Sequence, residues 1–385
     1  MPTRRMILTT AGAAAVVTVA GTAGMAWAPG GAPARAPWRQ AGESFGDPRL
    51  DALAYAILAP NPHNRQPWLF SLVGDNQIDI ICDLDRRLPE TDPPDRQLTI
   101  GFGCMLELLS MATAEKGFDA DIVAFPDGEP YPRLDQRRVA SVTFRVGARV
   151  QRDPLFQETL LRRTNRNAFD PNKPVAAEAI KTIVDAAIHG SSSDGTSDAA
   201  RRTRLIDLAR RGWIVEYENA ATRRESIELM RIGNRASANN PDGIALDGAM
   251  MGLLKMAGVM SPEKLDTPGD AAYEQGLSMY MALIESAQGF VWMTSDTNTR
   301  QDQINAGRDW VRMHLAAQAT GVAIHPLSQV LQEFPEMAAL YAETQAELGV
   351  AAPGVVQMLG RIGYAKAPAP SPRWPLQSRL VDANA

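Results

Sequence analysis

The stretch "IGFGCMLELLSMATAEKG", Ile100 to Gly117, decides the fold of this 385-residue chain because a second stretch repeats its pattern. Apolar residues recur in it at helical spacing, which predicts a buried helix that ends at a glycine cap. The second stretch, "INAGRDWVRMHLAAQATG" (Ile304 to Gly321), has Ile, Gly, Ala and Gly at the same steps of 3, 9 and 5 residues. We therefore expect two central helices of the same kind, one in each half of the chain.

The segments upstream of these helices also resemble each other. "LDALAYAILAPNPHN" (Leu50 to Asn64) and "AEAIKTIVDAAIHGSS" (Ala177 to Ser192) both begin with a helical run. Aligning them predicts a first half at 47–152, a second half at 153–376 and a tail at 377–385.

The second half is the longer one, and its extra residues predict an insertion at about 191–300. Within it, "GSSSDGTSD" (Gly190 to Asp198) has the composition of a loop. The segment Arg231 to Pro268 is rich in Gly, Met and Asn, and two interpretations of it remain open. It is either a flexible cover over a site or an ordinary helical insertion.

Two segments alternate apolar and polar residues and are expected to be strands: "QIDIICDLDR" (Gln77 to Arg86) and "VASVTFRVG" (Val139 to Gly147). Helical segments outnumber them, so the sequence predicts an α+β fold of mixed sheets surrounded by helices, made from two related halves. Cys82 is expected in a strand and Cys104 in a buried helix, both as small apolar side chains, with a single disulfide as the alternative.

Composition and short motifs exclude several classes of function. A net charge of -5 and a pI near 5.6 give no basic footprint for nucleic acid. The two cysteines form no CxxC pair and no histidine stands at ligand spacing, so no metal site is expected. The chain also lacks the GxSxG, GxGxxG and GxxxxGK[ST] motifs of hydrolases, dinucleotide folds and nucleotide-triphosphate folds.

The N-terminus predicts export. Two arginines in "TRRMIL" (Thr3 to Leu8) precede an uncharged stretch, Met6 to Ala28, that ends in the small-x-small pattern "AWA". We expect a signal at 1–28 that is cleaved after Ala28, which would make the protein periplasmic; an uncleaved membrane anchor is the alternative. The residues at 29–46 have the composition of a flexible linker, so the folded body is expected to start near Asp47.

The signal resembles the twin-arginine type. That resemblance implies the twin-arginine export machinery as a partner, with the membrane touched only through this segment. It also implies a bound cofactor, because this route carries proteins that are already folded.

Arginine is concentrated in "LLRRTNRNAFDPNKPV" (Leu160 to Val175). Arg162, Arg163 and Arg166, with Thr164 among them, present guanidinium groups and a hydroxyl from one short segment. Guanidinium forks match the oxygens of a phosphate, so the segment is a candidate phosphate site, with a solvated basic face as the alternative.

Four motifs together resemble nitroreductase-like flavoproteins, over roughly 47–376. "RRTNR" followed by "PV" and a helix is similar to the opening of that family, where such arginines hold the phosphate of flavin mononucleotide (FMN). "APNPHNRQPW" (Ala59 to Trp68) resembles the family's turn beside the isoalloxazine ring, and "GYAKAPAPSPRWPL" (Gly363 to Leu376) resembles its C-terminal end. "AIHPLSQ" (Ala323 to Gln329) matches more loosely the segment near the flavin N5 edge.

The resemblance implies FMN as cofactor and assigns site residues to it. The phosphate would be held by Arg162, Arg163, Arg166 and Arg373, with Thr164 as a supporting donor. The ring edge or ribityl chain would be bordered by Pro60, Asn61, His63 and Asn64, and the N5 edge by Leu327 and Ser328. Gln66 either contacts the flavin or fastens the turn to the sheet, whereas Pro67 and Trp68 set the turn and fill the core. No catalytic side chain is implied, because the chemistry takes place at flavin N5.

The motifs are divided between the halves. The first half has the turn but only Arg49 before it, and the second half has the arginines but "HGSSSDG" (His189 to Gly195) in place of the turn. An ordinary site of this family takes these parts from two subunits. The chain therefore resembles a fused dimer of the tandem, Acg-type branch, with one site kept and the other lost. A fused dimer has less need to pair again, so a monomer is expected.

The resemblance implies an exported FMN-dependent oxidoreductase. It would take electrons from a small-molecule donor and pass them to a small acceptor of the nitroaromatic, quinone or enone class. The first alternative is a protein that sequesters FMN under a lid with little turnover, and the second is a structural relic without flavin.

Overall fold

The computed structural model describes residues 33–147 and 150–382. The predicted signal at 1–28 and the first residues of the predicted linker lie outside the described residues.

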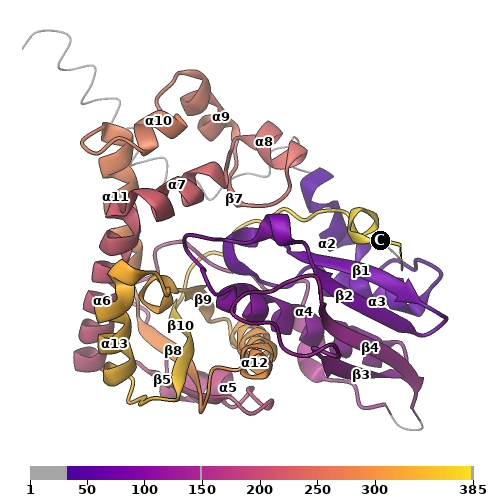
Figure 1. Cartoon of the computed structure of the whole chain (residues 1–385). Helices are drawn as coiled ribbons and strands as arrows, with labels where there is room; N and C mark the ends of the chain where they lie inside the picture. The colour runs from indigo at the N-terminus through magenta and orange to yellow at the C-terminus, as the bar shows by residue number, and fades with distance from the viewer. Residues whose placement is uncertain (1–32, 148–149, 383–385) are drawn as a thin grey trace, which may run out of the picture.

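The first half is an antiparallel sheet packed on helices (Figure 1). Its strands follow the order β1-β2-β4-β3, and every neighbouring pair is antiparallel. Its elements are α3 (Pro48–Ala56), β1 (Trp68–Val73), β2 (Gln77–Cys82), α4 (Arg96–Glu115), β3 (Phe118–Ala124) and β4 (Arg138–Val146).

The second half has the same arrangement. Its sheet has the order β5-β8-β10-β9, again antiparallel throughout, with a long helix between its second and third strands in sequence. Its elements are α5 (Ala177–Val184), β5 (Ser192–Thr196), β8 (Gly289–Ser295), α12 (Arg300–Ala319), β9 (Ala323–Pro326) and β10 (Val355–Gly363). The prediction of an α+β fold with two related halves is confirmed.

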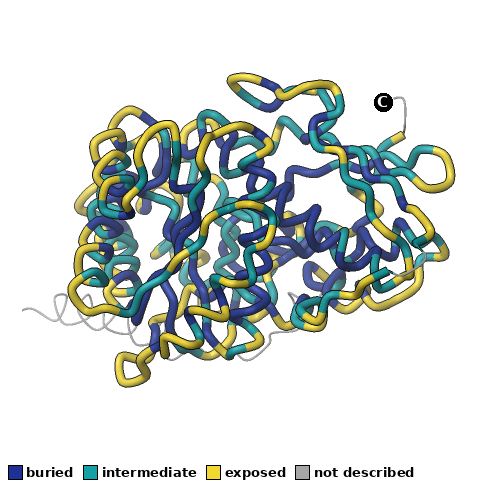
Figure 2. The backbone as a smooth tube through the Cα atoms, turned by 90° about the horizontal axis from the view of Figure 1, so that it is seen from below, coloured by how far each residue is buried: buried dark blue, intermediate teal, exposed yellow. Residues whose placement is uncertain are grey.

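The two long helices, α4 and α12, pack against each other at the centre, where Figure 2 shows buried backbone. They approach closely because Gly103 and Gly307 face each other, and a Cβ on either would lie 2.8 Å from the other's Cα. Each helix is followed by a glycine with positive φ, +85° at Gly117 and +70° at Gly321. This left-handed conformation favours glycine, so the predicted glycine caps are confirmed.

The predicted loop "GSSSDGTSD" is wrong, because most of it is strand β5. This edge strand pairs with β8 from Ser192 opposite Thr294 to Thr196 opposite Phe290. Backbone pairing with β8 overrides the poor strand propensity of serine and glycine. Gly195 is also required by packing, since a Cβ there would lie 2.6 Å from Cγ2 of Ile180.

The insertion is helical and lies between β5 and β8, so its limits are 197–288 rather than about 191–300. Its upper part sits above the first half in Figure 1, and its lower helices line the second sheet together with α13 (Ala338–Glu347). Its elements are α6 (Ala199–Glu218), α7 (Ala220–Glu228), β6 (Met230–Ile232), α8 (Asn234–Asn239), β7 (Ile244–Leu246), α9 (Ala249–Met256), α10 (Pro262–Leu265) and α11 (Ala271–Glu285).

The predicted flexible linker is also wrong over its described part. Residues Pro33–Arg35 and Ala36–Gln40 (α2) form short helices, and Trp38 is buried. The Trp38 indole donates to Ser371 O at 2.8 Å, and Arg373 N donates to Ala34 O at 2.8 Å. Contacts with the C-terminal segment therefore order a stretch whose proline and alanine content indicated a linker.

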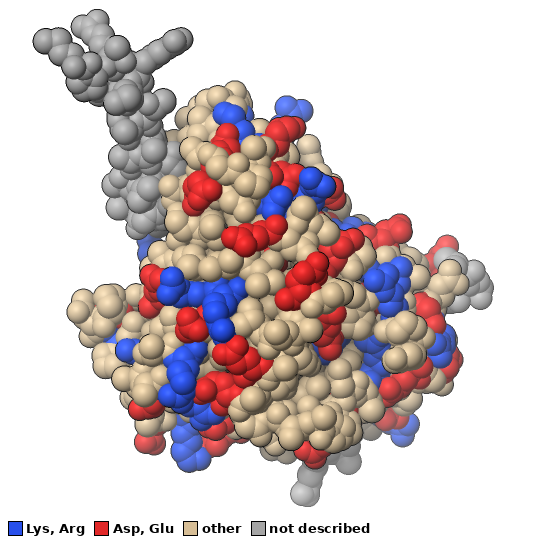
Figure 3. Space-filling model, turned by 60° about the vertical axis from the view of Figure 1, so that its left-hand side comes forward, with Lys and Arg blue, Asp and Glu red and all other residues tan. Residues whose placement is uncertain are grey.

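The cysteine prediction is confirmed: Cys82 ends β2, Cys104 lies in α4, and both are buried and free. By length and composition α4 is the one described helix that could cross a membrane, but most of it is buried inside the protein. On the face shown in Figure 3, basic and acidic side chains are interspersed.

Candidate functional site

The turn after α3 has a strained backbone. His63, Asn64 and Gln66 have φ values of +45°, +52° and +51°, which are unusual for residues other than glycine. Such strain persists only where the surrounding structure enforces it, and it is concentrated at functional sites.

Side chains of the turn fasten it on several sides. Asn61 Oδ1 accepts from Gln66 N at 2.8 Å, and Asn64 Nδ2 donates to Pro372 O at 3.0 Å. Gln66 donates to Pro241 O at 2.8 Å and accepts from Trp374 N at 2.9 Å. Gln66 thus fastens the turn to the insertion and the C-terminal segment rather than to the sheet, and its contact with flavin stays a prediction.

Beyond the turn, Trp68 is fully buried, with Phe102 edge-on at 6.4 Å, so it fills the core as predicted.

The arginine segment of the second half is joined to β9. Thr164 forms an isolated parallel bridge with Ile324, and Asn165 N donates to Ile324 O at 3.0 Å. Leu327, one residue beyond β9, is buried and donates its backbone N–H to Leu359 O at 2.8 Å. Ser328 follows as a partly exposed residue. The segment is therefore held beside the other predicted second-half residues.

Arg162 brings the two halves together. Its side chain is only 2% exposed, and Nη2 donates to Leu58 O, just before the turn, at 3.3 Å. Its Nε and Nη1 have no hydrogen-bond partner. A buried guanidinium with two unused donors is costly unless an acceptor such as an anion occupies the space beside it.

Arg373 also crosses between the halves. It is buried and donates to the carbonyl oxygens of Ile57, Leu58 and Ala59, at 2.9 to 3.0 Å. Its Nη1 lies 2.6 Å from Asn64 Oδ1. Arg373 therefore holds the end of α3 and the turn, and its donors are directed at these neutral oxygens. Its phosphate role stays a prediction.

The arginines form a cluster without a negative partner. Arg163 and Arg373 both stack on Trp38, with 4.8 Å and 5.5 Å from guanidinium carbon to ring centroid. Among the residues the structure describes, no carboxylate forms an ion pair with Arg162, Arg163, Arg166 or Arg373. Burial lowers the pKa of Arg162 and of Arg163 to about 10, and for Arg162 the charge of Arg163 adds to this.

Two further residues of the predicted site, His63 and Arg166, interact electrostatically. Arg166 is exposed, and its charge acts on His63. Burial, then Arg166 and Arg65, lower the pKa of His63 to about 4, so the ring is neutral at pH 7. His63 Nδ1 has no hydrogen-bond partner. The residues present thus fit a polar anionic ligand: Arg162 has unused donors for an anion, and His63 of the turn is neutral with an unused ring nitrogen.

The insertion covers the turn. Asp242 pairs with Arg86 at 2.8 Å and Arg231 at 2.7 Å, and with Arg65 of the turn at 3.4 Å. Gly243 N also donates to Asn64 O at 3.3 Å. Two interpretations of Arg231 to Pro268 were left open, a flexible cover and an ordinary helical insertion. The structure shows a folded segment with helices that contacts the turn through Asp242 and Gly243.

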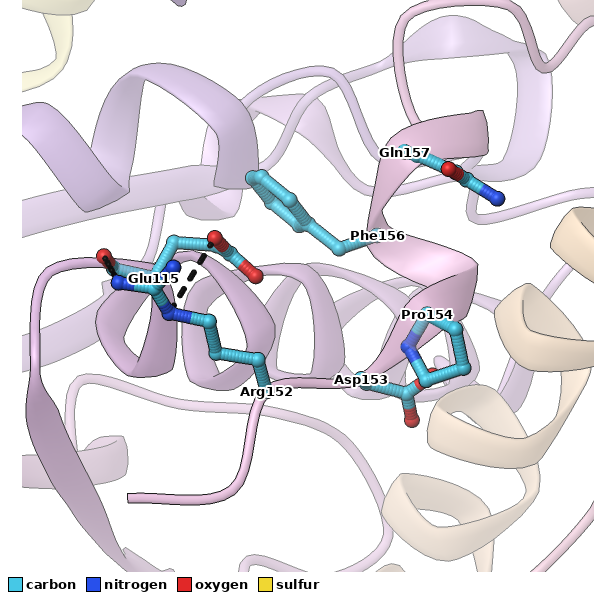
Figure 4. Close-up of a pocket in the computed structure, with 6 residues that line it drawn as sticks. All are labelled: Glu115, Arg152, Asp153, Pro154, Phe156 and Gln157. Atoms are coloured by element: carbon cyan, nitrogen blue, oxygen red, sulfur yellow. Dashed lines mark hydrogen bonds and ion pairs between the residues drawn. The ribbon is translucent and has the colours of Figure 1, made fainter. Parts of the chain in front are cut away.

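A hollow of about 360 Å³ lies elsewhere (Figure 4). It is lined by Glu115, Phe156 and the segment Arg152 to Pro154, and Arg152 points toward Glu115 at 3.6 Å. Its charges are already paired, and none of the predicted site residues lines it. Within residues 33–147 and 150–382, no group of three or more His, Cys, Asp or Glu side chains could hold a metal ion.

Three residues that the sequence did not assign form a hydrogen-bonded chain that reaches the arginine segment at Asn167. Arg361 Nε donates to His325 Nδ1 at 2.9 Å, and His325 Nε2 lies 3.3 Å from the hydroxyl of Tyr280. Arg361 is fully buried in β10. A charged residue inside an otherwise uncharged strand, "VVQMLGRIG", is the signal that could have identified it.

The sequence of the chain was compared with protein-family models and with known proteins. No protein-family model matches the chain. The chain is similar to nitroreductase-like oxidoreductases along most of its length.

One such relative is a "Putative NAD(P)H nitroreductase Rv3131" from Mycobacterium tuberculosis. It is 26% identical over 344 residues, which cover 86% of this chain and 90% of the relative. A "Putative NAD(P)H nitroreductase acg" from the same organism is 31% identical over 143 residues, which cover 35% of this chain and 40% of the relative.

Solved structures include more distant matches. A putative nitroreductase from Anabaena variabilis matches 86% of this chain and 91% of its own, with a TM-score of 0.44 and 10% identity. A nitroreductase with bound FMN from Bacteroides fragilis matches 55% of this chain and 88% of its own, with a TM-score of 0.32 and 15% identity.

Proposed function

We propose that the protein is an exported FMN-dependent oxidoreductase that reduces a small nitroaromatic, quinone or enone acceptor in the periplasm. The observation that carries the proposal is the buried Arg162, with two unused donors and no carboxylate partner, against the strained turn of the other half. The relatives described as NAD(P)H nitroreductases support the same reaction class.

The residues of this site divide their work. Arg162 and Arg163 would hold the phosphate of FMN, while Arg373 keeps the end of α3 and the turn in place. His63, Asn64 and the strained backbone would border the ring. When bound, the flavin supplies hydride transfer, and the protein positions it and restricts access.

The proposed periplasmic location limits which electron donors the enzyme could use. NAD(P)H is held in the cytoplasm, so an exported enzyme requires another reductant, such as a quinol or a membrane partner. The alternative location is the membrane surface, if the N-terminal segment is not cleaved.

The absorption spectrum of gently purified protein tests the proposal. We expect bound flavin, or uptake of added FMN at one molecule per chain. A colourless protein that takes up no FMN would leave only the relic interpretation. Turnover is tested by reducing the bound flavin with dithionite and adding 1,4-naphthoquinone or a nitroaromatic.

Sequestration of FMN is the second candidate function, and the pairing of Asp242 with Arg65, Arg86 and Arg231 over the turn favours it. Asp242→Asn would weaken these ion pairs and loosen the cover. If the intact protein holds FMN but reacts slowly, and Asp242→Asn speeds both flavin release and reduction, the protein sequesters its cofactor. Fast reaction of the intact protein would count against this candidate.

A further inference from the structure

Tyr280, on α11 of the insertion, presents a hydroxyl group beside the candidate site. Its ring packs on Trp213 of α6, with 4.2 Å between ring centroids, and meets the His325 ring edge-on at 5.7 Å. The charge of Arg166, a residue of the candidate site, acts on both Tyr280 and His325. Hydrogen bonds also join this group to the arginine segment, since Arg361 donates to Asn167 O and Asn165 N donates to Ile324 O, the residue before His325. The insertion therefore places Tyr280 next to the arginine segment of the candidate site.

The hydrogen bonds fix which atom carries each proton. A guanidinium can only donate, so His325 Nδ1 accepts from Arg361 Nε at 2.9 Å. Burial, then the charge of Arg361, lower the pKa of His325 well below its usual value, so the ring is neutral. The single proton of a neutral ring must then be on Nε2, which donates to the Tyr280 oxygen at 3.3 Å.

Arg361 is itself held in place by its remaining donors. Nη1 donates to Ser286 Oγ at 2.9 Å, and Nη2 donates to Asn167 O at 2.8 Å. The guanidinium also stacks on Phe169, 4.1 Å from guanidinium carbon to ring centroid. The chain from Arg361 through His325 to Tyr280 is therefore rigid.

The Tyr280 oxygen accepts a second hydrogen bond, from Gln329 Nε2 at 3.3 Å. With two donors directed at this oxygen, the hydroxyl proton must point elsewhere. Within the part of the chain that the structure describes, no acceptor for it is found, and the neighbouring Arg166 cannot accept a proton. The hydroxyl is thus free to donate to a ligand.

We propose that Tyr280 donates its proton to the oxygen of a bound quinone or enone acceptor, with His325 and Arg361 as positioning residues. This inference rests on the proposed function, because it supplies the proton which that reaction needs. Two-electron reduction of a quinone to a hydroquinone takes up one hydride, which reduced flavin would supply, and one proton. The Tyr280 O–H bond breaks as the acceptor O–H bond forms, its electron pair stays on the phenolate oxygen, and water then reprotonates Tyr280.

Burial raises the pKa of Tyr280, so the hydroxyl keeps its proton at pH 7 until an acceptor takes it. Neighbouring groups offset part of the cost of the phenolate that this step leaves behind. His325 and Gln329 donate to the oxygen, and Arg166 and Arg361 place positive charge near it. Hydrogen bonds to a charged form stabilise that form.

The test compares two acceptors on flavin-loaded protein reduced with dithionite. 1,4-Naphthoquinone needs a proton, whereas ferricyanide takes electrons without one. Tyr280→Phe is expected to slow oxidation by naphthoquinone about 100-fold, the usual contribution of a general acid, and to leave oxidation by ferricyanide unchanged. Tyr273→Phe, on the same helix, is the matched control and should change neither reaction.

His325→Leu removes a donor to Tyr280 and should slow the naphthoquinone reaction less than Tyr280→Phe does, with ferricyanide again unaffected. Equal slowing of both acceptors by Tyr280→Phe, or no slowing of naphthoquinone, would overturn the inference while leaving the proposed function in place.

A second measurement needs no flavin. Naphthoquinone bound near Tyr280 should quench the fluorescence of Trp213, a signal that Trp213→Phe removes. Tyr280→Phe is expected to weaken this binding about fivefold, the loss of one neutral hydrogen bond. A protein that takes up no FMN would defeat the proposed function, whereas unchanged quinone binding in Tyr280→Phe would defeat the role of Tyr280.

Discussion

The turn after α3 and its counterpart after α5 occupy equivalent places in two halves with the same strand order. The two turns differ in how the charged side chains near them are partnered. The first turn lies against Arg162, which has unused donors and no carboxylate partner. The second is closed by Asp309, a fully buried residue of α12 that accepts from the backbone N–H groups of Ile188 and His189 at 2.7 and 2.8 Å.

Further charges near the second turn are also neutralised. Glu107 of α4 accepts from Arg308 and Arg312 of α12, each at 2.8 Å, and lies 2.9 Å from His189 Nε2. The charges around the second turn are thus satisfied internally, whereas Arg162 beside the first turn keeps two unused donors. The difference teaches that two equivalent turns in related halves can have different charge environments, one with unused donors and one with its charges paired.

The largest expected effect comes from the contact between Gly103 and Gly307, where α4 and α12 pack against each other. Gly307→Val would force side-chain atoms into Gly103 and the backbone of Ile100, so α4 and α12 could not pack. We expect a loss of at least about 4 kcal/mol in the free energy of unfolding, measured by urea denaturation. Gly252→Ala, where a Cβ meets nothing within 4 Å, is the control. A stable Gly307→Val protein would show that the close approach is not required.

Glu107→Gln should affect stability and not binding. It leaves Arg308 and Arg312 without their carboxylate partner in a buried site, which costs about 3–5 kcal/mol. FMN affinity should be unchanged, since the candidate site lies at the other turn. A large loss of FMN affinity at full stability would contradict the assignment of FMN binding to the first turn and of stabilisation to the second.

The same carboxylate predicts an acid transition. Burial alone would raise the pKa of Glu107, but His189, Arg308 and Arg312 outweigh it and lower the pKa to about 2. A lowered pKa in the folded state means that the stabilisation is present above the unfolded value of 4.5 and is lost as the pH falls toward 2. In the Glu107→Gln protein, the free energy of unfolding should fall less between pH 4.5 and pH 2, as measured by acid denaturation.

Arg162→Met should have the opposite pattern. Two charge-assisted hydrogen bonds to a phosphate would be lost, so FMN affinity should fall about 100-fold, or roughly 2.7 kcal/mol. Stability of the flavin-free protein should rise, because an apolar side chain replaces a buried charge with unused donors. Isothermal titration and urea denaturation measure the two effects. Arg152→Met, at the hollow of Figure 4, is the matched control, and equal affinity loss in both variants would contradict the assignment.

The sequence predicted the parts of this comparison that depend on local pattern. The glycine spacing in Ile100 to Gly117 and Ile304 to Gly321 identified the central helices, because a close helix contact and a left-handed cap both require glycine. The arginines and the polar turn were identified as partners from their motifs. The structure brings Arg162 to Leu58, 104 residues away in the chain.

The remaining features depend on contacts that no local pattern encodes. Strand β5 exists because β8 pairs with it, and the helix around Trp38 is ordered by the C-terminal segment. Tyr280 meets His325 across 45 residues of sequence. Composition indicated a loop and a linker for the first two and gave no signal for the third.

Asp309→Asn has the smallest expected effect and sharpens the comparison most directly. An amide can keep one oxygen for the N–H groups of Ile188 and His189, but its NH₂ group would face Ser191 N, which now donates to the other carboxylate oxygen at 3.2 Å. We expect a loss of about 1–3 kcal/mol in the free energy of unfolding, the cost of one unsatisfied buried donor. Flavin stoichiometry should stay at one per chain, because this end has no unpaired arginine cluster to hold a phosphate. Uptake of a second FMN by Asp309→Asn would show that Asp309 alone keeps the second site closed. The turns after α3 and α5 would then be more alike than their charges indicate.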